Sequence, residues 1–203
     1  MKMTNYRALP KSRGFTMVEI LVTIIILSIG LLGVAALQVT GMRSVNSASH
    51  RTHATILVDD IAERMRANPV AVDGNLYMGV NSAVNIDCAA IPATYCGEFY
   101  DTGTSAVTAA TNCNPTQLAT FDISTWYCGV PSGGVLTGGV QSVLPQASAT
   151  ITCIDTDPPS GADGDACTDN SPHIISLSWS ELNPNRTSAT ANNTQTLAVT
   201  IQP

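Results

Sequence analysis

The chain has 203 residues, of which 44% are hydrophobic and 12% charged, and its formal net charge is −6 at pH 7. This composition excludes an intrinsically disordered chain, and the length suits one ordinary domain with an appendage. The acidic balance argues against nucleic-acid binding, because an acidic surface repels phosphate backbones.

Residues 1–14 form a basic leader. The leader holds Lys2, Arg7, Lys11 and Arg13 and no acid, whereas all acids lie in the rest of the chain. Positive charge beside a membrane span favours the cytoplasmic side. We therefore expect a single-pass protein with its N-terminus in the cytoplasm and its larger part in the periplasm.

A long apolar run follows the leader. No charged residue occurs between Glu19 and Arg43, which leaves 23 positions. A helix of this length measures about 34 Å and exceeds the hydrocarbon core of about 30 Å, so we predict a membrane span. The run is too long for the apolar part of a secretory signal peptide. An ordinary anchor does not explain Glu19, because a carboxylate at mid-membrane costs about 2.5 to 3.5 kcal/mol on insertion scales.

Cleavage after Gly14 would explain this acid. The cut frees the amine of Phe15 at the start of the helix, where the helix dipole also favours the negative charge of Glu19. Between helices packed side by side, the carboxylate of one subunit can meet the amine of the next and fix their axial stagger. We interpret Glu19 as the residue that sets the assembly register.

The stretch RGFTMVEILV, residues 13–22, resembles the class III signal of type IV pilins and related pseudopilins. In these families a prepilin peptidase cuts after the glycine and methylates the new N-terminal phenylalanine. The resemblance therefore implies cleavage between Gly14 and Phe15, N-methylation of Phe15, and pairing of Glu19 with the amine of a neighbouring subunit. Major pilins usually have a proline where this chain has Ala36, which argues against a bulk filament subunit.

The helix is expected to continue beyond the membrane. Its apolar residues recur at helical spacing. They are Ala54, Leu57, Val58, Ile61 and Met65. Asn68 is a natural end, because the following Pro69 disfavours the α conformation at this residue. We expect one helix from residue 15 to about 67, with a membrane and assembly part over 15–42 and an amphipathic part over 43–68.

Residues 69–203 are expected to form a periplasmic head that contains every cysteine of the chain. These are Cys88, Cys96, Cys113, Cys128, Cys153 and Cys167. An even number in loop-like sequence favours disulfides in an oxidising compartment. A zinc site is disfavoured, because neither a CxxC pair nor a Cys/His cluster is present. Many pairings are open; we propose only Cys153 with Cys167, which flank a loop between two predicted strands.

The head is predicted to combine one helix with an antiparallel sheet. Asn114 and Pro115 predict a capped start for a helix over 116–126. Alternating apolar residues predict strands at 149–154, 173–179 and 196–201. The glycine pairs at 133–134 and 138–139 are expected to form a flexible connection. The predicted fold class is α+β: the type IV pilin fold, with a long N-terminal helix packed on a C-terminal antiparallel sheet with disulfide-stapled loops.

The loop between the first two strands is rich in acids and forms a weak calcium candidate. Its acids include Asp155, Asp157, Asp163 and Asp165. Calcium takes clustered oxygen ligands, but the spacing departs from the EF-hand pattern. We favour a solvated loop and expect no metal or other cofactor. We also expect no enzyme activity, because the chain has neither a nucleophile motif nor a phosphate-binding loop.

Four further stretches resemble the PilV family of minor pilins. They read LSIGLLGVAALQ, DDIAERMRANP, TQLATFDISTW and IISLSWSE. The resemblance implies a part in initiating and assembling a type IV pilus, with roles in cell adhesion and twitching motility. The implied partners are other minor pilins, the major pilin, a tip adhesin, the prepilin peptidase and the assembly platform of the bacterial inner membrane.

Two alternatives stay open. A pseudopilin of a type II secretion or competence system shares the same N-terminal chemistry. A single-pass periplasmic protein that uses its head for ligand binding or adhesion belongs to another class, and would retain residues 1–14.

Overall fold

The structure is a computed structural model that describes residues 14–78, 80–81, 86–89, 94–155, 167–168, 170–182 and 192–203. The chain divides after Asn46 into an N-terminal unit and a larger unit, Ser47–Pro203, which we call the head. The strands of the described residues all lie in the head.

The first helix, α1, runs from Met17 to Ala67 without interruption and confirms the predicted long helix. In the N-terminal unit its apolar side chains are exposed; Leu37, for example, is 74% exposed. The helix is long and apolar enough to cross a membrane. The hydroxyls of Thr23, Ser28 and Thr40 donate to backbone carbonyls of the preceding turn. These polar groups are thus satisfied inside the helix, as an apolar surrounding requires.

In the head, α1 buries the apolar stripe that its spacing predicts. The buried residues are Ala54, Leu57, Val58, Ile61, Ala62 and Met65. They form one core with Trp126 and with the inward side chains of the sheet, including Ile175 and Leu177. The helix ends before Asn68 as predicted, and a short helix that the sequence did not reveal, α2 (Pro69–Asp73), follows at once.

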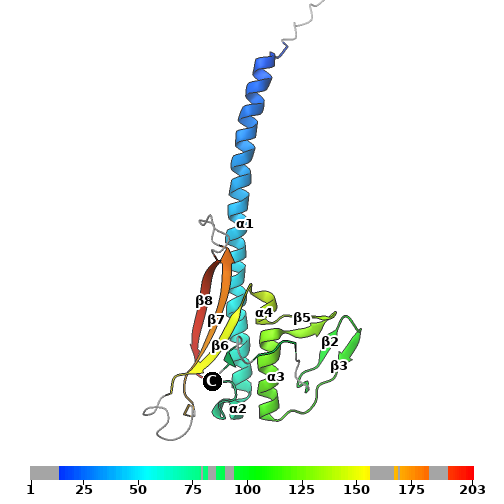
Figure 1. Ribbon diagram of the computed structural model, residues 1–203, viewed down its shortest axis with the longest axis vertical. Coiled ribbons are helices and arrows are strands. Elements are labelled where there is room, and N and C mark those ends of the chain that lie inside the picture. The colour runs from blue at the N-terminus through cyan, green and yellow to red at the C-terminus, as the bar shows by residue number, and fades with distance from the viewer. Residues whose placement is uncertain are drawn as a thin grey trace, which may run out of the picture. The chain divides into compact units, whose positions relative to one another are not determined.

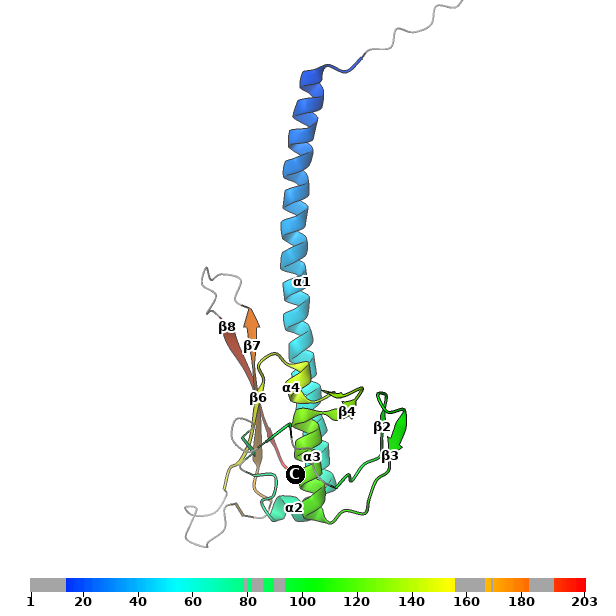
Figure 2. The same ribbon diagram turned by 45° about the vertical axis from the view of Figure 1, so that its right-hand side comes forward.

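The head contains a four-stranded antiparallel sheet with strand order β1-β6-β7-β8. The strands are β1 (Val80–Asn81), β6 (Ser148–Cys153), β7 (His173–Leu182) and β8 (Asn192–Ile201). Thus β6, β7 and β8 confirm the three predicted strands. Figures 1 and 2 show this sheet along one side of the head part of α1. Alternate residues of β7, from His173 to Trp179, are buried, and the residues between them are only partly buried.

The next helix, α3 (Pro115–Cys128), packs on α1 and confirms the prediction from Asn114 and Pro115. The Asn114 side chain accepts from the backbone N–H of Gln117, and the Gln117 side chain accepts from the backbone N–H of Asn114. This reciprocal capping box fixes the start of α3. A one-turn helix, α4 (Val140–Val143), leads back to the sheet.

Two small hairpins lie beside α3 (Figure 1). One joins β2 (Phe99–Asp101) to β3 (Ala106–Thr108), and the other joins β4 (Val130–Ser132) to β5 (Val135–Thr137). The prediction of a flexible connection at residues 133–134 is wrong. Gly133 and Gly134 have φ angles of 63° and 82° and form the tight turn of the second hairpin. Two adjacent residues with positive φ are what such a turn requires, and glycine provides this at little steric cost.

All six cysteines form disulfides: Cys88–Cys128, Cys96–Cys113 and Cys153–Cys167. The third bond is the pairing that the position of its cysteines suggested, and it joins the end of β6 to the segment before β7. The first two fasten the irregular chain before α3 to the two ends of that helix. The three disulfides thus fix loops of the head that the short strands alone would not hold in place.

Candidate functional site

Gly14, Phe15 and Thr16 precede α1 in non-helical, exposed backbone. Phe15 is 79% exposed. The peptide bond between Gly14 and Phe15, which the sequence predicts to be cleaved, therefore lies outside the helix and is open to a second protein.

Thr16 caps the first turn of α1, a feature that the sequence analysis missed. The backbone N–H of Glu19 donates to the Thr16 hydroxyl over 3.3 Å and to the Thr16 carbonyl over 3.1 Å. The sequence signal was present, because Thr16 and Glu19 have the Ser/Thr-x-x-Glu spacing of a capping box. The start of α1 is therefore set by a local side chain.

Glu19 lies in this first turn, close to the helix N-terminus. It lines one shallow hollow together with Phe15, Ile20 and Thr23. No salt bridge between described residues includes Glu19. The exposed carboxylate thus shares a surface with the first residue of the predicted mature chain, at the end of the helix where the dipole favours negative charge.

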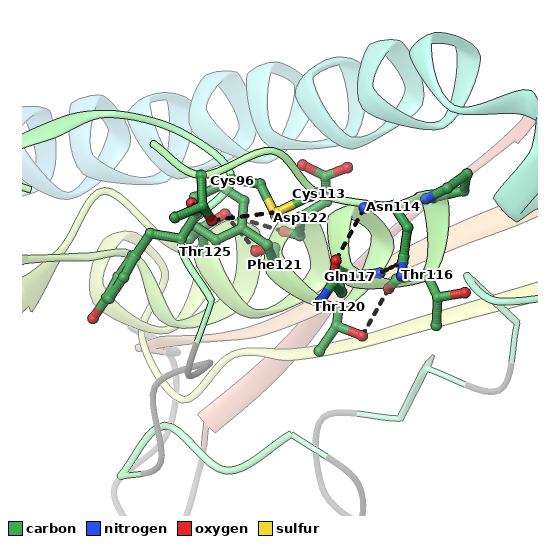
Figure 3. Close-up of a disulfide and its surroundings, with 12 residues drawn as sticks. Cys96, Cys113, Asn114, Thr116, Gln117, Thr120, Phe121, Asp122 and Thr125 are labelled. Carbon is green, nitrogen blue, oxygen red and sulfur yellow. Dashed lines mark hydrogen bonds between the residues drawn. A yellow bond between two sulfur atoms is a disulfide. The ribbon is translucent and has the colours of Figure 1, made fainter. Parts of the chain in front are cut away.

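A cluster of polar side chains joins α1 to α3 in the head. The Arg64 guanidinium donates to the Thr125 hydroxyl over 3.0 Å and lies 3.4 Å from a carboxylate oxygen of Asp122. The Tyr77 hydroxyl donates to the other carboxylate oxygen over 2.7 Å. The Asn68 side chain donates to the carbonyl of Pro115 at the start of α3. Figure 3 shows Asp122 and Thr125 on α3.

Burial governs the ionisation of this cluster. It raises the pKa of Asp122 above the ordinary value, although the Tyr77 hydrogen bond and the positive charge of Arg64 act in the opposite direction. Burial and the hydrogen bond to Asp122 also raise the pKa of Tyr77, which keeps its proton. Tyr77 is therefore a fixed donor to Asp122.

Three of the four stretches that resemble minor pilins supply contacts that join elements of the head to α1. DDIAERMRANP supplies Arg64 and Asn68, and TQLATFDISTW supplies Asp122, Thr125 and Trp126. IISLSWSE lies on β7, where the Trp179 indole donates to Glu181 over 3.0 Å. The other carboxylate oxygen of Glu181 accepts from the Ser47 hydroxyl on α1 over 2.9 Å. These stretches therefore hold α3 and the sheet on the helix.

The two hairpins are fastened to each other by Asp101. Its carboxylate accepts from the backbone N–H of Gly133 over 3.0 Å and of Gly103 over 2.9 Å. These bonds hold the pKa of Asp101 below its ordinary value. Tyr100 and Val107 are cross-strand partners on the first hairpin, and each is 56% exposed. The first hairpin thus exposes Tyr100 and Val107 to solvent, and the Asp101 hydrogen bonds hold it against the second hairpin.

A disulfide fixes the chain segment that leads into the first hairpin. Cys96–Cys113 lies next to the capping box at Asn114 and Gln117, so the chain that leads to β2 is tied to the N-terminus of α3 (Figure 3). The Tyr95 ring beside it contacts Phe99 and Phe121. The exposed face of the hairpins is thus positioned by covalent and aromatic contacts.

The calcium candidate lies mostly beyond the described chain. One carboxylate oxygen of Asp155 accepts from the backbone N–H and the hydroxyl of Thr168. Asp157, Asp163 and Asp165 fall outside the described residues. Within the described ranges, no group of three His, Cys, Asp or Glu residues is arranged to hold a metal ion.

Comparison with known families identifies two parts of the chain. A family model described as Tt1218-like, type IV pilin Tt1218, matches residues 36–124, and a model of the prokaryotic N-terminal methylation motif matches residues 9–35. Searches of curated proteins and of solved structures found no match. The long apolar helix, the antiparallel sheet, the disulfides and the first family match together show the α+β type IV pilin fold.

Proposed function

We propose that this chain, a type IV pilin-like protein with the N-terminal methylation motif, is a minor pilin that takes part in initiating and assembling a type IV pilus. Pilins are structural proteins that assemble with other pilins in a membrane-anchored pilus system. The proposal specifies the place of this chain among them.

The observation that carries the proposal is the combination found before and within α1. The methylation motif covers residues 9–35, and α1, which begins inside this range at Met17, exposes its apolar side chains in the N-terminal unit. Such a surface needs lipid before assembly and neighbouring helices afterwards. A subunit that exchanges lipid for other pilin helices satisfies both needs.

The N-terminal chemistry suggests how a subunit joins its neighbours. Cleavage after Gly14 gives Phe15 a free amine, which is then methylated and remains positively charged. Glu19 meets the amine of an adjacent subunit, because an unpaired carboxylate in an apolar surrounding is costly. The pair forms at one axial offset only, so it sets the register of the new subunit.

The head supplies the surface that distinguishes this subunit. The basic leader favours a head in the periplasm, where disulfides form. The hairpins with the exposed Tyr100 suit contact with another minor pilin or a tip adhesin, because tyrosine is enriched among the residues that carry most of the binding energy at interfaces.

A minor role, as in the PilV family, is favoured over that of the bulk subunit. Major pilins usually have a proline at the position of Ala36, whereas α1 here runs through Ala36 without a break. The junction of α1 and α3 is built from the stretches that resemble PilV. A subunit that starts a filament and is present in few copies would fit these features.

The experiment compares pili from cells that carry the wild-type chain, Glu19→Ala or Thr23→Ala. Sheared pili are purified and the chain is quantified by immunoblot against the major pilin. We expect the wild type and Thr23→Ala at a low, constant ratio, and Glu19→Ala in the membrane but depleted from pili. Absence of the wild type from pili, together with its recovery in a secretion complex, would favour the pseudopilin alternative.

A further inference from the structure

We infer that Thr16 is a positioning residue for cleavage of the precursor: by capping α1 it keeps the Gly14–Phe15 bond in open backbone, where a peptidase can reach the carbonyl. The inference rests on the proposed function, since it takes cleavage after Gly14 as given. Thr16 takes no part in breaking the bond; it acts only by setting where the helix begins.

The geometry at the helix start carries this inference. The Thr16 hydroxyl accepts from the N–H of Glu19, while the Thr16 carbonyl accepts from the N–H groups of Glu19 and Ile20. The helix begins at Met17. Gly14 and Phe15, which flank the predicted cut, therefore both lie outside the helix.

The boundary needs a cap because its surroundings favour a longer helix. The first N–H groups of any helix have no partner within the helix, and an apolar environment makes unpaired groups more costly. An uncapped α1 gains by adding turns toward the polar leader. Extension through Phe15 would let the Gly14 carbonyl accept from the N–H of Val18, two positions into the present helix. The bond to be cut would then have to unwind before it could be attacked.

The expected size of the effect follows from the strength of N-caps. Loss of a threonine cap typically shifts a helix-boundary equilibrium about fivefold. Serine and asparagine cap at least as well as threonine, whereas valine has nearly the same shape and no acceptor. This ranking separates capping from direct recognition of Thr16 by the peptidase, which would depend on the shape or hydroxyl of the side chain.

The test measures initial cleavage rates of the full-length chain in membranes that contain a prepilin peptidase. The substrates are the wild type, Thr16→Val, Thr16→Ser, Thr16→Asn and the control Thr40→Val. Thr40 is a suitable control because it lies far along α1 from the cut and its hydroxyl donates to the Ala36 carbonyl one turn earlier. We expect Thr16→Val to be cut about fivefold more slowly, and the other three variants within about twofold of the wild type.

A second readout follows the start of the helix. In detergent micelles, hydrogen exchange at the Val18 amide, which gains the Gly14 carbonyl as its acceptor when the helix extends, should be about fivefold slower in full-length Thr16→Val and normal in Thr16→Asn. Equal cleavage of Thr16→Val and wild type would overturn the inference, and so would slow cleavage of Thr16→Asn with normal exchange at the Val18 amide. If the wild type itself is not cut, the proposed function fails; if only the Thr16 ranking fails, the proposed function stands.

Discussion

The indole Nε1 of Trp126 donates a hydrogen bond to the backbone carbonyl of Leu57 over 2.7 Å and joins α3 to α1 inside the core. Trp126 is 1% exposed, so water cannot replace this bond. The two residues are 69 positions apart in the chain. The packing of α3 on α1 is therefore held by a buried contact between distant parts of the chain.

Trp126→Phe should lower the free energy of unfolding of the head by about 2 kcal/mol, because it removes a buried hydrogen bond and leaves a cavity. Trp179→Phe is the matched control, since Trp179 is also buried but donates to the partly buried carboxylate of Glu181. Water can solvate that carboxylate, so we expect a smaller loss. The urea midpoint, followed by fluorescence of the remaining tryptophan, measures both. An equal loss in the two variants would contradict a special role for the Leu57 contact.

Asp122 should make the head less stable as pH rises. Its pKa is raised in the folded state from an ordinary value of 3.8, so folding favours the protonated form. This contribution is fully present below the ordinary pKa and is lost as pH rises through the raised one. Asp122→Asn remains neutral throughout.

The measurement is the difference in free energy of unfolding between wild type and Asp122→Asn, taken from below the ordinary aspartate pKa to neutral pH. We expect the wild type to lose its advantage as pH rises. A difference that instead grows with pH would mean that Arg64 outweighs burial and keeps Asp122 ionised.

Gly139→Ala should destabilise the head by about 3 kcal/mol, because the added carbon meets backbone atoms that cannot move independently. The new Cβ would lie 2.5 Å from the carbonyl carbon of Cys128. The φ angle of Gly139 is −87°, which suits any residue, so the effect is steric. Gly134→Ala is the control: its Cβ meets no atom within 4 Å, and its positive φ should cost about 1 kcal/mol. Thermal unfolding that ranks Gly134→Ala as the more damaging change would contradict this packing.

Neutralising the leader should impair orientation without affecting the fold of the head. Replacement of Lys2, Arg7, Lys11 and Arg13 by glutamine removes the charge bias that keeps the N-terminus in the cytoplasm. Heads retained in the cytoplasm would carry reduced thiols. Thiol labelling of whole cells should therefore show a larger fraction of reduced chains, and protease added to spheroplasts should digest fewer heads. An unchanged oxidised fraction would show that the leader does not set the orientation.

The sequence predicted those elements whose signals are local. The end of α1 at Asn68 follows from the proline after it, the start of α3 from Asn114 and Pro115, and the buried stripe of α1 from its spacing. The strands β6, β7 and β8 were likewise recognisable, because their apolar residues alternate, whereas β1 and the strands of the two hairpins were not predicted. In each case a short stretch carries enough information to specify the element.

The features that were missed depend on partners far along the chain. The turn at Gly133 and Gly134 looked flexible, because nothing nearby in sequence reveals that Asp101 and its hairpin brace it. The cluster of Arg64, Tyr77 and Asp122 arises only when α1 and α3 pack together. Two disulfide pairings stayed open for the same reason, since the distance between cysteines is set by the fold. The cap at Thr16 is the exception: its spacing to Glu19 was visible in the sequence.

The most direct test of the account is the intact mass of the chain isolated from cells that contain a prepilin peptidase and from cells that lack it. With the peptidase, the mass should correspond to a chain that begins at Phe15, carries one additional methyl group and retains three disulfides. Without the peptidase, residues 1–14 should be present. Retention of residues 1–14 in both cell types would contradict the account, because Glu19 would then have no new amine to meet.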